Sequence, residues 1–90
     1  MKNILTYPAV FRKEDLGFSA ELIDIPGAIT QGDDLKEAED MAKDVLYLTI
    51  QDYINNLPKP TKDFSNIKLN DGDFISNIEL DIQEYGNNII

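Results

Sequence analysis

The sequence predicts an α+β fold in which three antiparallel strands are followed by one long helix and a final strand. Apolar residues recur at spacings of three and four between Leu35 and Asn55, which is typical of a helix with one buried face. Segments rich in β-branched and aromatic residues, bounded by glycine or proline turns, stand before and after this stretch. We therefore expect a β-β-β-α-β order, with the helix across one face of the sheet and the final strand joining an edge.

The first expected strand runs from Ile4 to Phe11 and is apolar on both faces. Its side chains alternate, with Ile4 and Val10 on one face and Leu5, Tyr7 and Phe11 on the other. We therefore expect the second face to be covered by more protein or by another chain. Pro8 has no N–H, so it should lie at a bulge or where its nitrogen points away from a neighbouring strand.

The next two strands follow closely along the chain. A polar turn ending in Gly17 leads to a second strand, Phe18 to Ile25, and the first two strands form a β-hairpin. Pro26 and Gly27 then form a turn, in which Gly27 supplies the positive φ of a type II geometry. A short third strand, Ala28 to Gln31, completes the antiparallel meander.

The helix has start and stop signals in the sequence. Asp34 is the expected N-cap, and Glu37 stands at the third helical position, as in a capping box. Pro58 prevents the helix from continuing far beyond Asn55.

The chain after the helix returns to the sheet. The expected segments are an extended exit at residues 57–61, an irregular stretch at 62–69 in which Phe64, Ile67 and Leu69 fold back onto the core, a turn at 70–73, a last strand from Phe74 to Ile82, and a short tail at 85–90. On the last strand, Glu79 and Asp81 are expected to face outward.

Size and composition limit the classes of function. Ninety residues, 42% of them hydrophobic, suit one globular domain spanning residues 1–90. The chain contains no cysteine and no histidine, which excludes a disulfide scaffold, a thiol nucleophile, a histidine base and metal sites built on Cys or His. It has no leader-peptide pattern and no apolar stretch of membrane-spanning length, so we expect a cytoplasmic protein with no membrane partner.

The formal net charge of −9 is large for this length. It disfavours direct binding of this chain alone to phosphate backbones and favours a basic partner. A simpler interpretation is that the charge keeps the domain soluble.

Three acidic groups are candidate sites. Asp33 and Asp34 could form a metal or acid/base pair, but helix capping explains an acid here. Residues 70–73 resemble the start of a calcium loop, yet position twelve counted from Asp71 is Ile82 rather than a glutamate. Glu79 and Asp81 share one strand face, where they bind a metal or a basic partner or are simply solvated. No serine has a histidine to activate it, so the sequence predicts no enzyme, no metal and no cofactor.

Several short motifs stand in a fixed order along nearly the whole chain. They are Tyr7-Pro8-Ala9-Val10-Phe11, Gly17-Phe18-Ser19-Ala20-Glu21, Asp24-Ile25-Pro26-Gly27-Ala28-Ile29-Thr30-Gln31-Gly32-Asp33, Glu37-Ala38, Leu57-Pro58-x-Pro60-Thr61 and Leu80-Asp81-Ile82-x-x-Tyr85. This ordered set resembles the HicB antitoxin family. The resemblance implies a partial ribonuclease-H-like fold, with the last strand beside the first and parallel to it, but without the active-site carboxylates of ribonuclease H.

The resemblance also implies a function. HicB-like proteins bind and neutralise HicA, a small basic ribonuclease toxin, by covering its RNA-binding surface and catalytic histidine. The implied protein is thus the antitoxin of a type II toxin–antitoxin system, with a HicA-like toxin as partner and a homodimer or higher homo-oligomer as its own state. Many family members carry a C-terminal DNA-binding domain, and we expect none here because the sequence stops soon after the final strand.

Six residues are the candidates for contact with the toxin: Tyr7, Glu21, Asp24, Glu79, Asp81 and Tyr85. Four others are assigned to the fold: Pro26, Gly27, Gly32 and Asp34. An alternative function is a stand-alone oligomeric HicB-like module that binds another protein or a small molecule. A third is a metal-dependent nuclease, which would need converging carboxylates around two metal ions.

Overall fold

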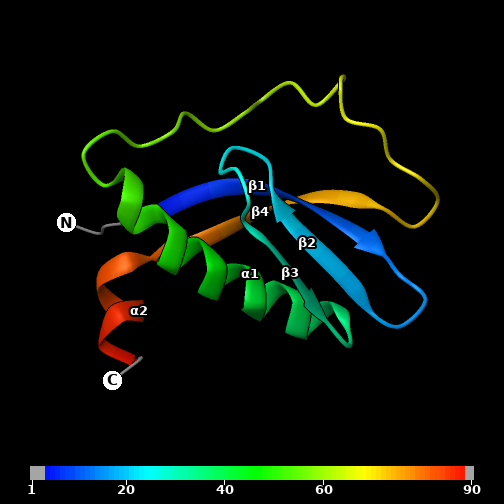
Figure 1. Cartoon of the computed structure of the whole chain (residues 1–90), viewed down its shortest axis with the longest axis horizontal. Coiled ribbons are helices and arrows are strands. Elements are labelled where there is room, and N and C mark those ends of the chain that lie inside the picture. Colours follow the sequence, from blue (N-terminus) through cyan, green and yellow to red (C-terminus); the bar gives the residue numbers. More distant parts are fainter. Residues whose placement is uncertain (1–3, 89–90) are drawn as a thin grey trace.

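The computed structural model describes residues 4–88 as a four-stranded sheet with a long helix on one face (Figure 1). The elements are β1 (Ile4–Lys13), β2 (Phe18–Leu22), β3 (Ile29–Gly32), α1 (Leu35–Ile50), a 3-10 turn (Gln51–Tyr53), β4 (Phe74–Asp81) and α2 (Ile82–Asn88). The predicted α+β class and the β-β-β-α-β core are therefore confirmed.

All strand pairs in the sheet are antiparallel, in the order β3-β2-β1-β4. The last strand lies beside the first as expected, but the expectation that it runs parallel to β1 is wrong: the pairing runs from Ile4 opposite Asp81 to Phe11 opposite Phe74. The reason is the path of residues 54–73, called here the return segment. It runs back along the whole length of the molecule before β4 begins, so β4 enters beside the end of β1 (Figure 1).

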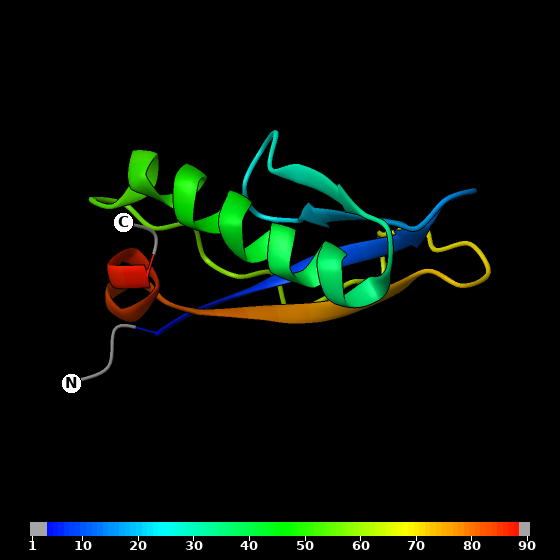
Figure 2. The same ribbon diagram turned by 90° about the horizontal axis from the view of Figure 1, so that it is seen from below.

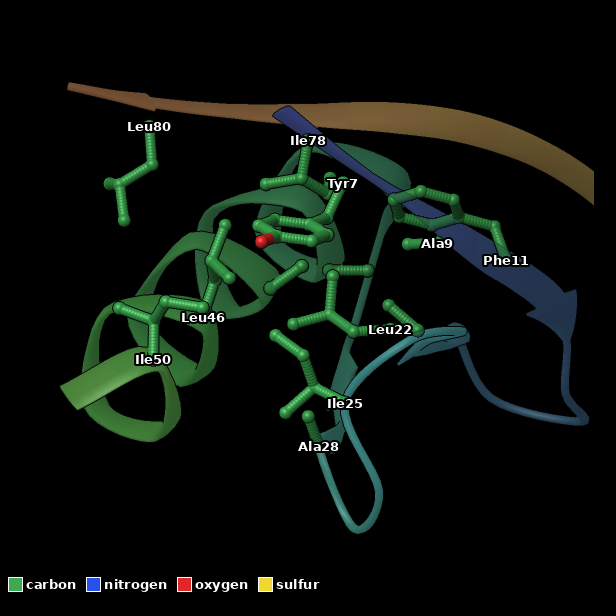
Figure 3. Close-up of a cluster of buried hydrophobic side chains, with 13 residues drawn as sticks. Tyr7, Ala9, Phe11, Leu22, Ile25, Ala28, Leu46, Ile50, Ile78 and Leu80 are labelled. Carbon is green, nitrogen blue, oxygen red and sulfur yellow. The ribbon is translucent and has the colours of Figure 1, made fainter. Parts of the chain in front are cut away.

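The main core lies between the sheet and α1 (Figure 3). On α1 a line of residues spaced four apart is buried, namely Ala38, Ala42, Leu46 and Ile50. They meet the inward side chains of the three longer strands, among them Tyr7, Phe11, Leu22 and Ile78. The rings of Phe11 and Phe74 stack with centroids 5.1 Å apart.

The start of α1 follows the predicted capping pattern. The Asp34 carboxylate accepts the Glu37 N–H at 2.8 Å, and the Glu37 carboxylate accepts the Asp33 N–H at 2.9 Å. The second bond reaches one residue further back than in the usual capping box. Gly32 lets the chain pass close to the helix, because a Cβ at this position would lie 2.2 Å from the Ala38 nitrogen. Gly27 has the expected positive φ of +81°.

The second face of the sheet, opposite α1, is covered by the same chain. Figure 1 shows the sheet lying between α1 and the return segment. Val10 is only 3% exposed there, and Pro8 is fully buried. Of the three apolar residues expected to fold back onto the core, Phe64 and Ile67 are half-buried and Leu69 is 42% exposed. None of the three belongs to the main core cluster, so that expectation is wrong.

Three polar anchors hold the return segment in place. Tyr7 donates its hydroxyl proton to the Pro58 carbonyl at 2.7 Å. The Asp24 carboxylate accepts the Thr61 N–H at 2.9 Å and also the Thr61 hydroxyl. Arg12 donates to the Lys68 carbonyl and forms an ion pair with Asp73, 3.0 Å between Nη1 and Oδ2.

The expected tail is a second helix, α2, which starts directly after β4 (Figure 2). The Asp81 carboxylate accepts the Glu84 N–H at 3.1 Å. The rings of Tyr85 and Tyr47 pack with centroids 5.4 Å apart, which ties α2 to α1. The tail expectation was wrong for residues 85–88, and residues 89–90 lie outside the described residues. Within residues 4–88, no helix is both long and apolar enough to cross a membrane.

Candidate partner-binding surface

β4 forms one edge of the sheet. The orientation of Pro8 on β1 shows which backbone groups of β4 point outward from this edge. The Ile23 N–H donates to the Pro8 carbonyl at 3.1 Å, so the backbone groups of Pro8 point toward the β2 side. In an antiparallel pair, two directly opposite residues point either toward each other or both away. Asn77 lies opposite Pro8, so its backbone N–H and C=O groups point away from β1. This geometry also confirms that the Pro8 nitrogen points away from β4.

The same alternation assigns the neighbouring residues of β4. Ile75, Asn77 and Glu79 direct their N–H and C=O groups to the free edge, and their side chains lie on the second face of the sheet. Among residues 4–88 no further strand pairs with this edge. In Figure 2, β4 runs along the outside of the molecule.

A groove of about 180 Å³ lies at the C-terminal end of this edge, between β4, α1 and α2. It is lined by Lys43, Glu79, Leu80, Asp81, Glu84 and Tyr85. The lining thus combines three acidic residues with one lysine, Leu80 and Tyr85, and the side chains of Glu79 and Asp81 lie on the second face of the sheet, away from α1.

Three of the six residues predicted to contact a partner come together at this groove, namely Glu79, Asp81 and Tyr85. Glu21 is exposed on the same second face, but two strands away, opposite Val10 on β1. Whether these residues bind a partner stays a prediction.

The other two candidates have structural positions. Tyr7 is 3% exposed and belongs to the main core, so its side chain does not reach the surface where a partner would bind. Burial, and to a lesser extent the negative charge of Asp24, raises the pKa of the Tyr7 hydroxyl. Asp24 is half-buried and uses both carboxylate oxygens to hold Thr61. Both residues anchor the return segment.

Lys43 and Glu84 line the groove but were not among the predicted residues. Lys43 lies on the flank of α1 that faces β4, and a helical pattern alone does not say which strand that flank will meet. The sequence does contain a signal for the position of Glu84 in the first turn of a helix. Asp81-Ile82-Gln83-Glu84 repeats the Asp-x-x-Glu spacing of Asp34-Leu35-Lys36-Glu37, and each begins a helix.

A second groove, of about 410 Å³, lies between the second face and the return segment. Its lining is Thr6, Pro60, Thr61, Lys62, Phe64 and Asn77.

Within residues 4–88 no three acidic side chains come close enough to hold a metal ion together. The Asp33–Asp34 pair and residues 70–73 are explained by capping and turn hydrogen bonds, since Asp73 accepts the Asn70 N–H at 2.9 Å.

No protein-family model and no curated protein matches this sequence. Solved structures do match. A chain of a toxin–antitoxin complex from Streptococcus pneumoniae is 25% identical with a TM-score of 0.75, over 91% of this chain and 72% of that chain. The crystal structure of the antitoxin HicB3 is 25% identical with a TM-score of 0.70, over 90% of this chain and 65% of that one.

A third structure, a complex of HicA3 and HicB3, contains a chain that is 22% identical with a TM-score of 0.60. The match covers 81% of this chain and 94% of that one. The likeness at this identity concerns the fold alone. Together these structures confirm the resemblance that the ordered motifs of the sequence indicate.

Proposed function

Since this chain is HicB-like in sequence pattern and in fold, we propose that it is the antitoxin of a type II toxin–antitoxin system. Its partner is a HicA-like ribonuclease, which it neutralises by covering the RNA-binding surface and the active site. The observation that carries this proposal is the fold, which matches chains in structures named as a toxin–antitoxin complex and as the antitoxin HicB3.

The charge distribution supports inhibition by occlusion. A ribonuclease must present a basic surface to the phosphate backbone of its substrate. A chain with net charge −9 competes for that surface, and the outward side chains of Glu79 and Asp81 on β4 offer it negative charge. Such charges speed the encounter of the two proteins, while buried apolar contacts give lasting affinity.

The composition supports a role without catalysis. The sequence has no histidine or cysteine to serve as base or nucleophile. Within the described part of the chain no cluster of three carboxylates is placed to hold a metal ion. We therefore propose that the antitoxin acts as a stoichiometric inhibitor.

The test is co-expression with the protein encoded next to this chain, followed by an RNA-cleavage assay of that protein with and without the chain. We expect a stable complex, loss of cleavage at equal molar amounts, and association that slows as ionic strength rises. If the neighbouring protein neither binds nor cleaves RNA, the proposal is wrong and the stand-alone binding module takes its place.

A further inference from the structure

The free edge of β4 has the features of a docking site for one more strand. It is eight residues long, it ends the sheet, and the N–H and C=O groups of Ile75, Asn77 and Glu79 point outward along it. An extended segment from a partner can add to such an edge through backbone hydrogen bonds, with side chains on alternate sides giving specificity.

We propose that a cationic, extended segment of the toxin adds to β4 as a fifth strand; this inference rests on the proposed function. Side chains of the added strand that lie next to Asn77, Glu79 and Asp81 share the second face of the sheet with them. Lysine or arginine is favoured there, because two of these three residues are acidic.

The positions between them select a different chemistry. The other side of β4 carries Ser76, Ile78 and Leu80, of which Ile78 and Leu80 are buried in the core beneath α1. Small or apolar side chains fit next to them. The expected segment therefore alternates basic residues with small or apolar ones.

A second copy of this chain fits the same edge poorly. In an antiparallel pairing of two β4 strands centred on Asn77, Glu79 of one copy lies opposite Ile75 of the other. Centred on Glu79, the two Glu79 side chains lie opposite each other. Like charges directly across a strand pair are destabilising, and each copy carries a net charge of −9. The net charge of each copy and the Glu79–Glu79 contact therefore disfavour self-pairing, whereas a basic strand meets no such repulsion.

The test removes one outward-pointing N–H from the edge without disturbing the β1–β4 ladder. Asn77→Pro does so because the Asn77 N–H points away from β1. Asn77→Ala is the matched control, since it removes the same side chain and keeps the N–H. We expect Asn77→Pro to weaken binding to the toxin about tenfold or more, and Asn77→Ala to change it by less than about twofold. Thermal melting of both variants checks that each one folds.

Charge is tested by a second pair of variants. Glu79→Gln removes a charge beside the groove, whereas Asp15→Asn removes one from an exposed position in the β1–β2 turn. We expect Glu79→Gln to weaken binding and to reduce its salt dependence more than Asp15→Asn does. Equal effects of the two variants would contradict the proposed position of the cationic segment.

Amide hydrogen exchange gives the residue-level result. On complex formation, exchange at Ile75, Asn77 and Glu79 should slow, while Ser76, Ile78 and Leu80, already paired with β1, should change little. Unchanged exchange at the three outward amides, or wild-type binding by Asn77→Pro, would overturn the inference even where the toxin is bound and inhibited. Concentration-dependent protection of these amides in the free protein would identify a second copy as the occupant and also overturn it.

The same readout separates this inference from the proposed function. A ten-residue peptide that alternates lysine and valine is added to the chain alone. If the neighbouring protein is not a toxin but the peptide protects the outward amides, the proposed function fails while the chemistry of the edge stands. If the peptide gives no protection and the toxin complex gives none either, the edge inference fails by itself.

Discussion

The two faces of the sheet are covered in different ways. On one face, α1 buries a continuous apolar core whose helical side is a line of alanines, a leucine and an isoleucine. On the other, an irregular segment is held by polar anchors from Asp24 and Arg12, and Tyr7 holds the start of this segment from the α1 side of the sheet. The free energy gained by burying apolar surface is spread over the whole contact area. Where a segment is held by a few anchors, the stabilisation depends instead on single hydrogen bonds. The α1 face should therefore govern global stability, and the second face should open locally.

The largest expected effect is on the α1 face. Leu46→Ala removes a fully buried side chain from the centre of the core and should lower the free energy of unfolding by about 2–5 kcal/mol. Chemical denaturation measures this loss. Leu48→Ala, on the same helix but 68% exposed, is the control and should change stability by less than about 0.5 kcal/mol. Similar losses for both variants would contradict the core described here.

A smaller effect is expected from the Asp24 anchor. Asp24→Ala leaves the Thr61 N–H and hydroxyl without their acceptor, which should cost about 1–3 kcal/mol. Hydrogen exchange should increase in the return segment and stay unchanged in α1. Faster exchange in α1 as well would show that the two faces are one cooperative unit and would remove the distinction between them.

The Tyr7 anchor should contribute less. Tyr7→Phe keeps the buried ring and removes only the hydroxyl that donates to Pro58, so a loss of about 0.5–1.5 kcal/mol is expected. Toxin binding should be unchanged, because the side chain is buried. A large loss of binding without a loss of stability would return Tyr7 to the list of contact residues.

The Arg12–Asp73 anchor should make the stability of the folded protein depend on pH in the acid range. The hydrogen bond from the Asn70 N–H, together with the Lys13 N–H and the Arg12 guanidinium, lowers the pKa of Asp73 below its ordinary value of 3.8. The folded state thus favours the charged form. The resulting stability is fully present above pH 3.8 and is lost as the pH falls through the lower pKa of the folded state. Asp73→Asn should flatten this part of the curve of melting temperature against pH, and an unchanged curve would contradict the assignment.

The parts of the fold that local chemistry determines could be predicted from the sequence. The helix and its start followed from apolar spacing and from Asp34 and Glu37, and the period of two along β4 placed Glu79 and Asp81 on one face. The direction of β4 could not be predicted, because the return segment is long enough to deliver the strand in either direction. Only its packing across the second face decides this.

The candidate site was predicted in part, for similar reasons. Tyr7 has a polar hydroxyl on an apolar ring, and the sequence does not say that a carbonyl of residue 58 will meet it inside the fold. The groove includes Lys43 and Glu84 because α1 and α2 meet near the end of β4. That meeting depends on a short helix whose only signal in the sequence is its Asp-x-x-Glu start.

The return segment also determines how the protein should behave after proteolytic cleavage. The hydrogen-bonded anchors hold both ends of the return segment, whereas Ser65 and Asn66, which lie between the anchors, are exposed. A protease that cleaves there leaves two pieces that share the full β1–β4 ladder and the stacked Phe11–Phe74 pair. We expect the pieces to stay associated, so that the nicked protein behaves as a non-covalent heterodimer, with β4 and α2 forming the smaller subunit.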